Sequence, residues 1–455
     1  SSPKPSSAAS DVYKRQDETT LSAVDVWTVV ASAMVLLMTP GLALFYGGMT
    51  RAKGVLNMMM MSFAALGLVI PVWILWGWSV SGGEPILGGL AGSPLQAPGL
   101  EDLIGTSDLL GVAFSCTFAI ISVALISGAV ADRMRFSAWL LFVPVWTTLV
   151  YAPLAFMVWG GGLLGADGAI GSRFGEAIDF AGGLVVHINA GVAALILILL
   201  IGPRQGFGKD SGQRPHNLPL VMLGAALLWF GWFGFNVGAA ATPEQAGLIL
   251  VNTMAAPATA MLGWLLVERT RDGHPTSLGA ASGAVAGLVA ITPACADVSP
   301  FWAMVLGLVA GMCSAVAVAL KYRMGMDDSL DVIGVHLVSG IVGTVALGFI
   351  AIPSAESAGG LFYGGGLALL GTQVIATVVS VIYCSVVTLV IALVIRAFVG
   401  LRITAEAEIE GIDITEHAES GYNLAGDASG SFRPRRPVPG SLEDVIERQK
   451  KEQRA

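Results

Sequence analysis

The chain alternates between long apolar runs and short polar connections along most of its length. An α-helix needs about 20 apolar residues to cross roughly 30 Å of hydrocarbon. Runs of that kind cover residues 25–48, 56–80, 109–131, 137–160, 180–201, 218–240, 247–267, 277–294, 302–321, 332–352 and 366–399. The pattern therefore predicts an all-α polytopic membrane protein with eleven transmembrane helices.

Basic residues predict the orientation of these helices. The connections after even-numbered runs hold only Arg173. The connections after odd-numbered runs and the segment after the last run hold Arg51, Lys53, Arg133, Arg135, Arg204, Lys209, Arg214, Arg269, Arg271, Lys321, Arg323, Arg396 and Arg402. Since cytoplasmic loops carry the excess of Lys and Arg, we expect the N-terminus outside and the C-terminus in the cytoplasm. The leading hypothesis given below places the chain in the inner (cytoplasmic) membrane.

Three segments follow from this reading. Residues 1–24 have no apolar periodicity and are predicted to be disordered and possibly non-native. Residues 25–400 form the eleven-helix domain, and residues 401–455 form a polar cytoplasmic tail. The tail is too short and too polar to be an enzyme domain.

Composition narrows the class further. Only 12% of the 455 residues are charged and 55% are hydrophobic, whereas soluble domains carry about 25% charged residues. No basic patch suggests nucleic-acid binding. The 4 cysteines lie apart in apolar stretches, so neither a zinc site nor a disulfide framework is indicated, and no cofactor is expected.

Two histidines lie inside apolar runs, in the shared pattern Val-His-x-x-x-Gly. His187 follows Asp179, and His336 follows Asp331. An ionisable group at membrane depth is costly, so it usually faces a cavity or a pathway. The alternative is that two buried imidazoles only tie helices together, and the repeated pattern favours the pathway.

The two Asp-to-His segments run in opposite directions across the membrane, as expected for an inverted repeat of two five-helix halves with one extra C-terminal helix. If the helices are continuous, His187 lies about 12 Å from Asp179 and His336 about 7.5 Å from Asp331 along the axis. Asp331 is expected to cap its helix. Asp179 is expected to cap as well, with an indirect electrostatic effect on a vestibule.

Aromatic residues gather on the predicted outer side. Phe114 and Phe118 are one helical turn apart, Trp159 ends a run, and Trp232 and Phe235 lie in the outer half of another. These rings are either an interfacial belt or a cage for a small cation, since each cation–π contact contributes about 0.5–2 kcal/mol.

These magnitudes constrain any transport of a cation. Moving a bare ion into a low-dielectric medium costs on the order of tens of kcal/mol, so aromatic contacts alone can only recruit it. An amine-type cation with a lysine-like pKa of about 10.4 loses its proton at pH 7 for about 4.6 kcal/mol. Histidine suits the path of that proton or of the neutral amine.

The residues at this point resemble the ammonium transporter family (Amt/Mep/Rh), closest to its bacterial and archaeal Amt branch. The resemblance extends from about residue 25 to 423. The matching motifs are Pro40-Gly-Leu-Ala-Leu-Phe-Tyr-Gly-Gly48, Ala131-Asp-Arg-Met-Arg-Phe-Ser137, Trp159-Gly-Gly-Gly162, Asp179-Phe-Ala-Gly-Gly183, Val186-His-Ile-Asn189, Gly231-Trp-Phe-Gly-Phe-Asn236, Thr292-Pro-Ala-Cys295 and Asp331-Val-Ile-Gly-Val-His336.

The resemblance implies a homotrimer in which each subunit has its own pore for ammonium. It implies that His187 and His336 are twin pore histidines, that Phe118 and Phe235 are stacked gate rings, and that Trp159 belongs to an outer ammonium site. The resemblance also places Asp179 beneath that site and Trp232 in the pore lining, and Phe114 joins the outer site. Residues 410–422 resemble the family's C-terminal region, on whose face PII-type signal proteins dock in many members.

One departure concerns the outer site. Ala239 stands where many Amt proteins have a serine that faces the cation. We therefore expect weaker recruitment of ammonium. The loop from Gly165 to Ala177 is a second departure, slightly longer than the family suggests.

The leading hypothesis is a transporter that recruits NH4+, removes its proton and conducts NH3 along the histidines, with or without separate proton transfer. The alternative is an ammonium sensor that acts through its tail and a soluble partner. An intramembrane metalloenzyme is disfavoured, because no third ligand is suitably spaced and no HExxH motif is present.

Overall fold

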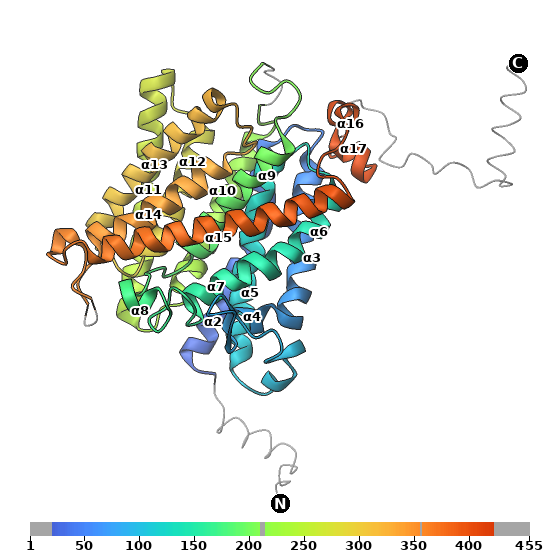
Figure 1. Cartoon of the computed structure of the whole chain (residues 1–455). Helices are drawn as coiled ribbons and strands as arrows, with labels where there is room; N and C mark the ends of the chain where they lie inside the picture. Colours follow the sequence, from blue (N-terminus) through green and yellow to red (C-terminus); the bar gives the residue numbers. More distant parts are fainter. Residues whose placement is uncertain (1–20, 210–213, 355–356, 423–455) are drawn as a thin grey trace, which may run out of the picture.

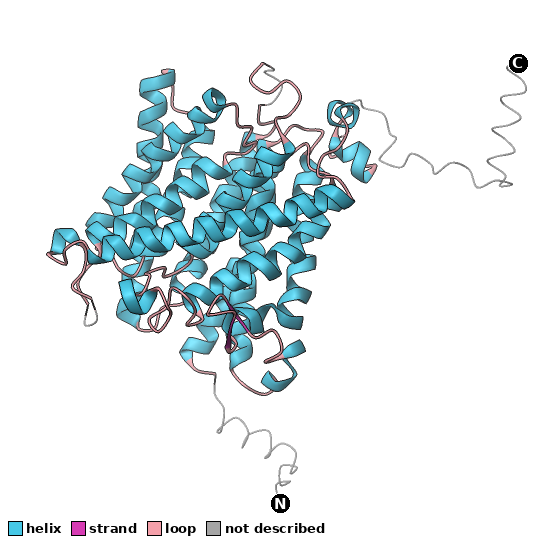
Figure 2. Ribbon diagram, in the orientation of Figure 1, coloured by secondary structure: helices cyan, strands magenta, loops and turns pink. Residues whose placement is uncertain are grey.

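The computed structural model describes residues 21–209, 214–354 and 357–422. Within these residues, eleven helices are long and apolar enough to cross a membrane, and the remaining elements are short. The predicted all-α polytopic fold with eleven spans is therefore confirmed, as the helical bundle in Figure 2 shows. Most of the predicted N-terminal disordered segment and the tail beyond residue 422 lie outside the described residues.

Some spans are single helices, and others join two or three helical segments. Span one is α2 (Ala23–Met49), and span two joins α3 (Val55–Val72), η1 (Trp73–Gly77) and α4 (Trp78–Gly82). Span three joins α5 (Asp108–Ile126) and η3 (Ser127–Val130), and span four joins α6 (Phe136–Trp146), η4 (Thr147–Tyr151) and α7 (Ala152–Trp159). Span five joins η5 (Gly183–Ile188) and α9 (Asn189–Ile201). Spans six and seven are the single helices α10 (Leu218–Val237) and α11 (Pro243–Asp272), and span eight joins α12 (Ser277–Ile291) and η7 (Thr292–Ala294). Span nine is α13 (Pro300–Met324), and span ten joins η8 (Ile333–Leu337) and α14 (Val338–Ile350). Span eleven is α15 (Ala368–Phe398).

Short elements occupy the connections. They are β1 (Pro85–Ile86), β2 (Ala91–Gly92), η2 (Pro98–Leu103), α8 (Gly171–Phe174), η9 (Leu361–Tyr363), α16 (Ala405–Glu410) and α17 (Ile412–His417). The two strands pair antiparallel in a small hairpin. Four spans contain a π-helical segment, namely η1, η4, η5 and η8, and such segments are often found at functional sites.

Polar residues at the ends of the apolar runs fix where helices begin. The side chains of Asn217, Thr242, Thr276 and Ser299 each accept a hydrogen bond from a backbone N–H of the first turn. Ser22 does so within a capping box with Asp25. These caps satisfy N–H groups that have no partner inside the helix.

The first spans of the two halves, α2 and α10, pack with their backbones close together. A Cβ at Gly224 would lie 2.3 Å from the backbone N of Phe45, and a Cβ at Gly48 would lie 2.6 Å from the carbonyl oxygen of Asn217. Small residues permit this approach, which supplies van der Waals contact where lipid provides no hydrophobic driving force.

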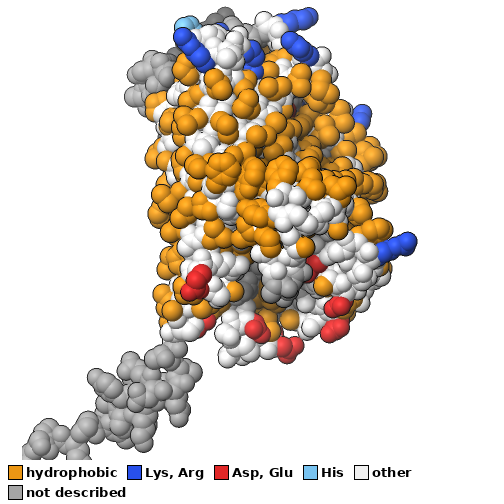
Figure 3. Space-filling model, turned by 90° about the vertical axis from the view of Figure 1, so that its left-hand side faces the viewer, with side chains coloured by type: hydrophobic (Ala, Val, Ile, Leu, Met, Phe, Trp, Pro, Cys, Tyr) orange, Lys and Arg blue, Asp and Glu red, His pale blue; other side chains and the backbone are white. Residues whose placement is uncertain are grey.

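The two ends of the bundle differ in charge. We call the end that carries α16 and α17 the tail end, and the opposite end, where α2 begins and α8 lies, the far end (Figure 1). Figure 3 shows a broad hydrophobic belt between them, with most of the visible Lys and Arg side chains at the tail end and the Asp and Glu side chains, together with one basic side chain, near the far end. This arrangement is the one that the basic residues of the sequence predict.

A buried ionic network joins the connections at the tail end. Arg204 contacts Asp327 at 2.8 Å and Asp132 at 3.5 Å, and Arg51 contacts Asp132 at 3.2 Å. Arg133, which is 0% exposed, lies 3.9 Å from Asp327. Connections from both halves of the fold are held together by these pairs.

Side chains of the tail cap the first turns of two membrane-spanning helices. The N-cap residue of α3 is Gly54, which has no side chain to offer. Asp413 takes its place: its carboxylate accepts hydrogen bonds from the backbone N–H groups of Leu56 at 3.0 Å and Asn57 at 2.7 Å. Glu416 accepts one from Phe136 at 3.0 Å, at the start of α6. The tail segment therefore acts as a cap for spans two and four.

Replacing Asp413 by alanine is expected to loosen the tail and lower thermal stability. The loss of an N-cap side chain costs about 0.5–2 kcal/mol. Limited proteolysis and the thermal midpoint of the detergent-solubilised protein measure both effects. Glu419→Ala is the control, because this residue is exposed and lies after the end of α17. Equal cleavage rates in the two variants would contradict the capping role.

Candidate functional site

The two histidines of the repeated pattern meet at the centre of the bundle. His187 lies in η5 and His336 in η8, so each occupies a π-helical segment near the start of its span. Nδ1 of His187 and Nδ1 of His336 are 3.3 Å apart, and the ring centroids are 5.4 Å apart at 21°. One ring therefore donates and the other accepts, so the neutral rings hold complementary tautomers.

The glycines of the pattern explain why the histidines meet. A Cβ at Gly191 would lie 2.5 Å from Cβ of Leu337, the residue that follows His336. A Cβ at Gly340 would lie 3.0 Å from Cγ1 of Ile188, which follows His187. Each glycine thus makes room for the residue next to the other histidine, and the two helices cross closely at this point.

The histidine pair borders a narrow cavity of about 10 Å3. A cavity needs about that volume to hold one water-sized molecule. Its other walls are mostly apolar and include Met38, Leu42, Phe45, Leu125, Leu228 and Val285. Nε2 of His187 has no hydrogen-bond partner within the described part of the chain, although the side chain is buried. The cavity has room for one small molecule, and both imidazole side chains line it.

Trp232 lines the same cavity. Its ring stacks on His187 with centroids 5.5 Å apart, and its Nε1 donates a hydrogen bond to Oγ1 of Thr292 at 2.8 Å. This bond satisfies the indole N–H and fixes the ring, so Trp232 presents an apolar face to the histidine.

A column of rings leads from the histidines toward the far end. Phe235 lies 6.1 Å from His187, and it stacks on Phe118 with centroids 4.0 Å apart at 10°. Phe118 contacts Trp159 at 6.3 Å and Phe114 at 4.9 Å, both edge to face. Phe118 and Phe235 are buried, so this stack separates the histidine cavity from the surface.

Trp159 and Phe114 are predicted to share one outer ammonium site. In the structure they line two different cavities. Trp159, which is 42% exposed, lines a cavity of about 610 Å3. Phe114 lines another of about 390 Å3 together with Ala239. Both rings contact Phe118, which lies between them. Ala239 is exposed, and its side chain supplies a methyl group to this hollow.

Asp179 organises the start of span five. Its carboxylate accepts hydrogen bonds from the backbone N–H groups of Gly182 (3.0 Å), Gly183, Leu184 (2.9 Å) and Val185 (3.2 Å). Burial raises the pKa of Asp179 to about 6, although these bonds favour the charged form. Asp179 therefore caps η5, and at neutral pH it remains mostly ionised.

Asp179 lies before the first residue of span five and is not part of its helix. Span five begins at Gly183, because Gly182 has a positive φ of 114° and breaks the run that the sequence places from residue 180. The estimate of 12 Å between Asp179 and His187, which assumes continuous helix, does not apply. The carbonyl oxygen of Asp179 also accepts a hydrogen bond from Nε1 of Trp159 at 2.7 Å, so the same residue positions the outer ring.

The predicted capping role of Asp331 is wrong. Its side chain forms an ion pair with Lys321 instead. The cap of this span is Asp328, whose carboxylate accepts from the N–H groups of Val332 at 3.0 Å and Ile333 at 2.7 Å. A loop that turns at Asp331, with φ of 66°, brings the earlier aspartate to the helix start.

Sequence reasoning also missed Asp297. Its carboxylate lines the 610 Å3 cavity with Trp159 and Asp179, and burial raises its pKa to about 6. The sequence signal that could have found it is its place two residues after the Thr292-Pro-Ala-Cys295 motif, in the connection between spans eight and nine. Among the described residues, no group of three or more His, Cys, Asp and Glu lies close enough to hold a metal ion.

Comparison with known proteins decides the family. Residues 26–422 match the model of the Ammonium Transporter Family. The chain belongs to this family. It is 50% identical over 454 residues to a protein of Mycobacterium tuberculosis named "Ammonium transporter", with 93% of this chain and 94% of the relative covered. The function of the chain is accordingly ammonium transport, and its family is one of transporters and not of enzymes.

Solved structures agree with the fold. The crystal structure of Saccharomyces cerevisiae Mep2 superposes with a TM-score of 0.78 at 29% identity, covering 90% of this chain and 94% of that one. A structure titled "Sensor Amt Protein" superposes with a TM-score of 0.79 at 26% identity, covering 87% and 98%. This chain therefore shares its fold with both of these proteins.

Proposed function

We propose that this ammonium transporter recruits NH4+ at the far end, beside Trp159 and Phe114, removes its proton near the Phe118–Phe235 stack, and conducts NH3 past His187 and His336. The aspartate beneath the outer site, Asp179, orients Trp159 and shapes the vestibule.

The observation that carries the proposal is the hydrogen-bonded histidine pair in a narrow, mostly apolar cavity of about 10 Å3. A bare cation entering it would lose its hydration at a cost on the order of tens of kcal/mol. Loss of a proton from an amine-type cation at pH 7 costs about 4.6 kcal/mol if its pKa is about 10.4. Passage as the neutral molecule is therefore cheaper, and the imidazole nitrogens supply hydrogen-bond partners along the way.

The proton can return to the cytoplasm by a separate route or stay behind. The first version makes transport electrogenic, and the second makes the protein a gas channel. Vesicles that contain the purified protein separate them when ammonium is added. Current that scales with the ammonium gradient supports the electrogenic version, and ammonia uptake without current supports the channel. Absence of both would reject the proposed transport path.

The charge distribution supports placing the tail end in the cytoplasm and the far end outside, in an inner-membrane protein. By its resemblance to the family, we also propose a homotrimer. The tail, which is docked through Asp413 and Glu416, forms part of a face suited to a PII-type cytosolic partner.

The second candidate function is ammonium sensing through the tail and such a partner. The superposition on the structure titled "Sensor Amt Protein" favours keeping it. Growth on limiting ammonium in a host that lacks its own transporters discriminates the two functions, because a pure sensor gives no rescue.

Replacing Ala239 by serine is expected to raise the apparent affinity for ammonium. The added hydroxyl would face the hollow beside Phe114 and accept a hydrogen bond from the cation, a contribution of about 0.5–1.5 kcal/mol and thus about 2-fold to 10-fold in affinity. Concentration-dependent uptake into vesicles measures it. Ala239→Val is the control for size, and an unchanged affinity in the serine variant would remove Ala239 from the recruitment site.

A further inference from the structure

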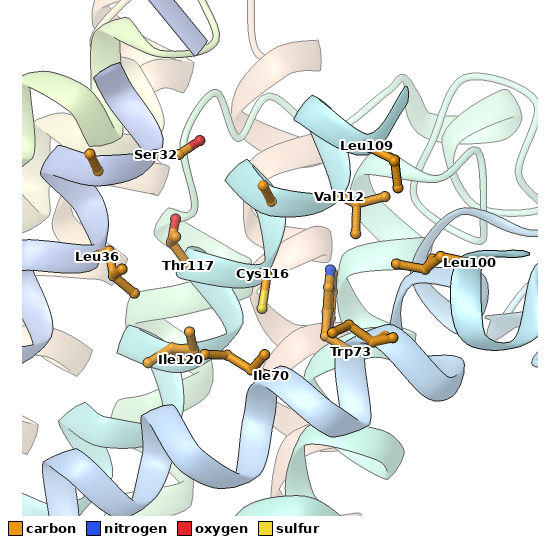
Figure 4. Close-up of a pocket in the computed structure, with 13 residues that line it drawn as sticks. Ser32, Leu36, Ile70, Trp73, Leu100, Leu109, Val112, Cys116, Thr117 and Ile120 are labelled. Atoms are coloured by element: carbon orange, nitrogen blue, oxygen red, sulfur yellow. The ribbon is translucent and has the colours of Figure 1, made fainter. Parts of the chain in front are cut away.

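The cavity that Trp159 lines is built differently from the apolar cavity between α2, α3 and α5. The apolar cavity, shown in Figure 4, has a volume of about 390 Å3 and shares no lining residue with the histidine cavity or with the cavity of Trp159. The cavity of Trp159, about 610 Å3, is lined by residues 174–180, most of which belong to the connection between α8 and span five. This wall includes Asp179, so the contacts that fix the wall also fix the residue that orients Trp159.

A side chain of the last span holds the chain directly before Asp179. Residues 175–178 have neither helix nor strand of their own. Oε1 of Gln373 in α15 accepts a hydrogen bond from the backbone N–H of Ile178 at 2.9 Å, and Nε2 of Gln373 donates to the carbonyl oxygen of Ile178 at 2.8 Å. One amide thus binds both backbone groups of the residue that precedes Asp179.

The amide of Gln373 is fixed in one orientation. Nε2 also donates to the carbonyl oxygen of Thr344 in α14 at 3.2 Å, and the side chain is 0% exposed. If the amide were turned over, its oxygen would face two carbonyl oxygens and its NH2 group would face an N–H group, so only the observed orientation satisfies all three contacts. Gln373 therefore ties the cavity wall to two membrane-spanning helices.

The rest of the wall packs closely on the same turn of α15. Gly175 has a positive φ of 98°, and a Cβ at this position would lie 2.9 Å from Oγ1 of Thr372. Oγ1 of Thr372 donates a hydrogen bond to the carbonyl oxygen of Phe174. Thr372 and Gln373 are neighbours, so one turn of α15 holds residues 174–178 at both ends, and Gln373 supplies the contact nearer to Asp179.

Asp179 is held by backbone contacts on both sides. Ile178 before it is bound to Gln373, and the N–H of Phe180 after it donates to the carbonyl oxygen of Pro293 at 3.2 Å. The carboxylate of Asp179 has its own hydrogen bonds to the start of span five, which do not involve Gln373. Loss of the Gln373 amide would therefore affect the direction of the Asp179 carbonyl group more than the cap of span five.

We propose that Gln373 is a positioning residue for ammonium recruitment, which fixes the backbone next to Asp179 and thereby the ring of Trp159. This inference rests on the proposed function, in which Trp159 binds NH4+ at the far end. Gln373 does not line the cavity, so it acts through Asp179 and Trp159 and does not contact the cation. Recruitment at the far end is thus controlled in part from span eleven.

Gln373→Met tests this role, because it keeps the length of the side chain and removes all three hydrogen bonds. We expect the ammonium concentration for half-maximal uptake into vesicles to rise about 2-fold to 5-fold, a part of the about 2-fold to 30-fold that one cation–π contact supplies. The maximal rate per folded protein is expected to change little. A merely structural role would lower the amount of active protein and leave the half-maximal concentration unchanged.

Thr377→Val is the matched control. Thr377 lies one turn further along α15, and its hydroxyl donates to the backbone carbonyl oxygen of Gln373 at 2.8 Å, within the same helix. The substitution removes a buried polar group of α15 without touching the cavity wall. We expect it to keep the half-maximal concentration of the wild-type protein.

Gln373→Glu tests the hydrogen bonds themselves. A protonated glutamate offers one donor and one acceptor to Ile178, as the amide does, whereas an ionised glutamate presents two oxygens to the carbonyl groups of Ile178 and Thr344. We expect near wild-type affinity at about pH 5, and a loss like that of Gln373→Met at about pH 8, since burial favours the neutral acid at the lower pH. This comparison decides the question alone if Gln373→Met does not fold.

Other charged groups near the wall also titrate or attract the cation. They are Arg173, Glu176, Asp179 and Asp297, and burial raises the pKa of Asp179 and of Asp297 to about 6. All four are present in the variant and in the wild-type protein. The ratio of the two half-maximal concentrations, taken at each pH, therefore isolates the effect of residue 373.

Trp159→Leu separates this inference from the proposed function. Unchanged affinity in Trp159→Leu would mean that the proposed outer site is wrong. Lower affinity in Trp159→Leu together with unchanged affinity in Gln373→Met would reject only the positioning role. We expect Gln373→Met to add nothing to Trp159→Leu, because both act through the same ring. Equal ratios for Gln373→Glu at the two pH values would also reject the positioning role.

Discussion

Replacement of His187 by alanine is expected to abolish selective ammonia flux in reconstituted vesicles while the protein still folds and assembles. The substitution removes the partner of Nδ1 of His336 and the buried, unpaired Nε2 of His187. It also replaces a ring with a methyl group, so water can enter a space that now holds about one small molecule. Stopped-flow measurement of internal pH after an ammonium pulse reports the flux.

The control for this experiment is His274→Ala, a histidine in an exposed connection. It is expected to leave the flux unchanged. Thermal midpoints and the assembled mass of both variants are compared with those of the wild-type protein, which separates lost conduction from lost fold. Unaltered flux in His187→Ala would return the pair to a purely structural role.

Replacement of Asp179 by alanine is expected to cause the largest loss of stability. Four backbone N–H groups at the start of span five would lose their acceptor in a buried place. A single unsatisfied buried group costs about 1–3 kcal/mol, so a combined loss of at least about 3 kcal/mol is expected. Asp179→Asn retains one acceptor oxygen and is expected to fall between the wild-type protein and the alanine variant.

The thermal midpoint of the solubilised protein measures this order of stabilities. Glu176→Gln is the control, because Glu176 lines the same cavity but is exposed. If Asp179→Ala folded with an unchanged midpoint, yet bound ammonium more weakly, the role of Asp179 would be electrostatic. A drop in both quantities supports the capping role together with the positioning of Trp159.

The spans were predictable because the bilayer sets their length. Apolar runs of about 20 residues are hard to place elsewhere, and all eleven predicted runs coincide with helices of the structure. The histidines were predictable for the same reason, since an imidazole in such a run is costly. Both inferences rest on local composition, which the sequence displays directly.

Other features depend on contacts between distant residues. Asp413 caps α3 from a position 356 residues away from Asn57, and no local pattern announces it. Asp331 directly precedes the helix and was therefore expected to cap it. The positive φ of Asp331 turns the chain so that the carboxylate of Asp328 accepts the hydrogen bonds of the first turn instead. The π-helical segments η5 and η8 were not predicted either, because the apolar runs that contain them read as continuous α-helix.

The close crossing of spans five and ten has a consequence for how selectivity can change. The close approach at the crossing involves Gly191 with Leu337 and Gly340 with Ile188, and a Cβ at Gly340 would also lie 3.4 Å from Cβ of His187. The imidazole rings themselves are not among these nearest neighbours, so the spans can keep their crossing when a ring is replaced by a smaller side chain. A single methyl group added at position 191 would instead push the two spans apart and displace both side chains together.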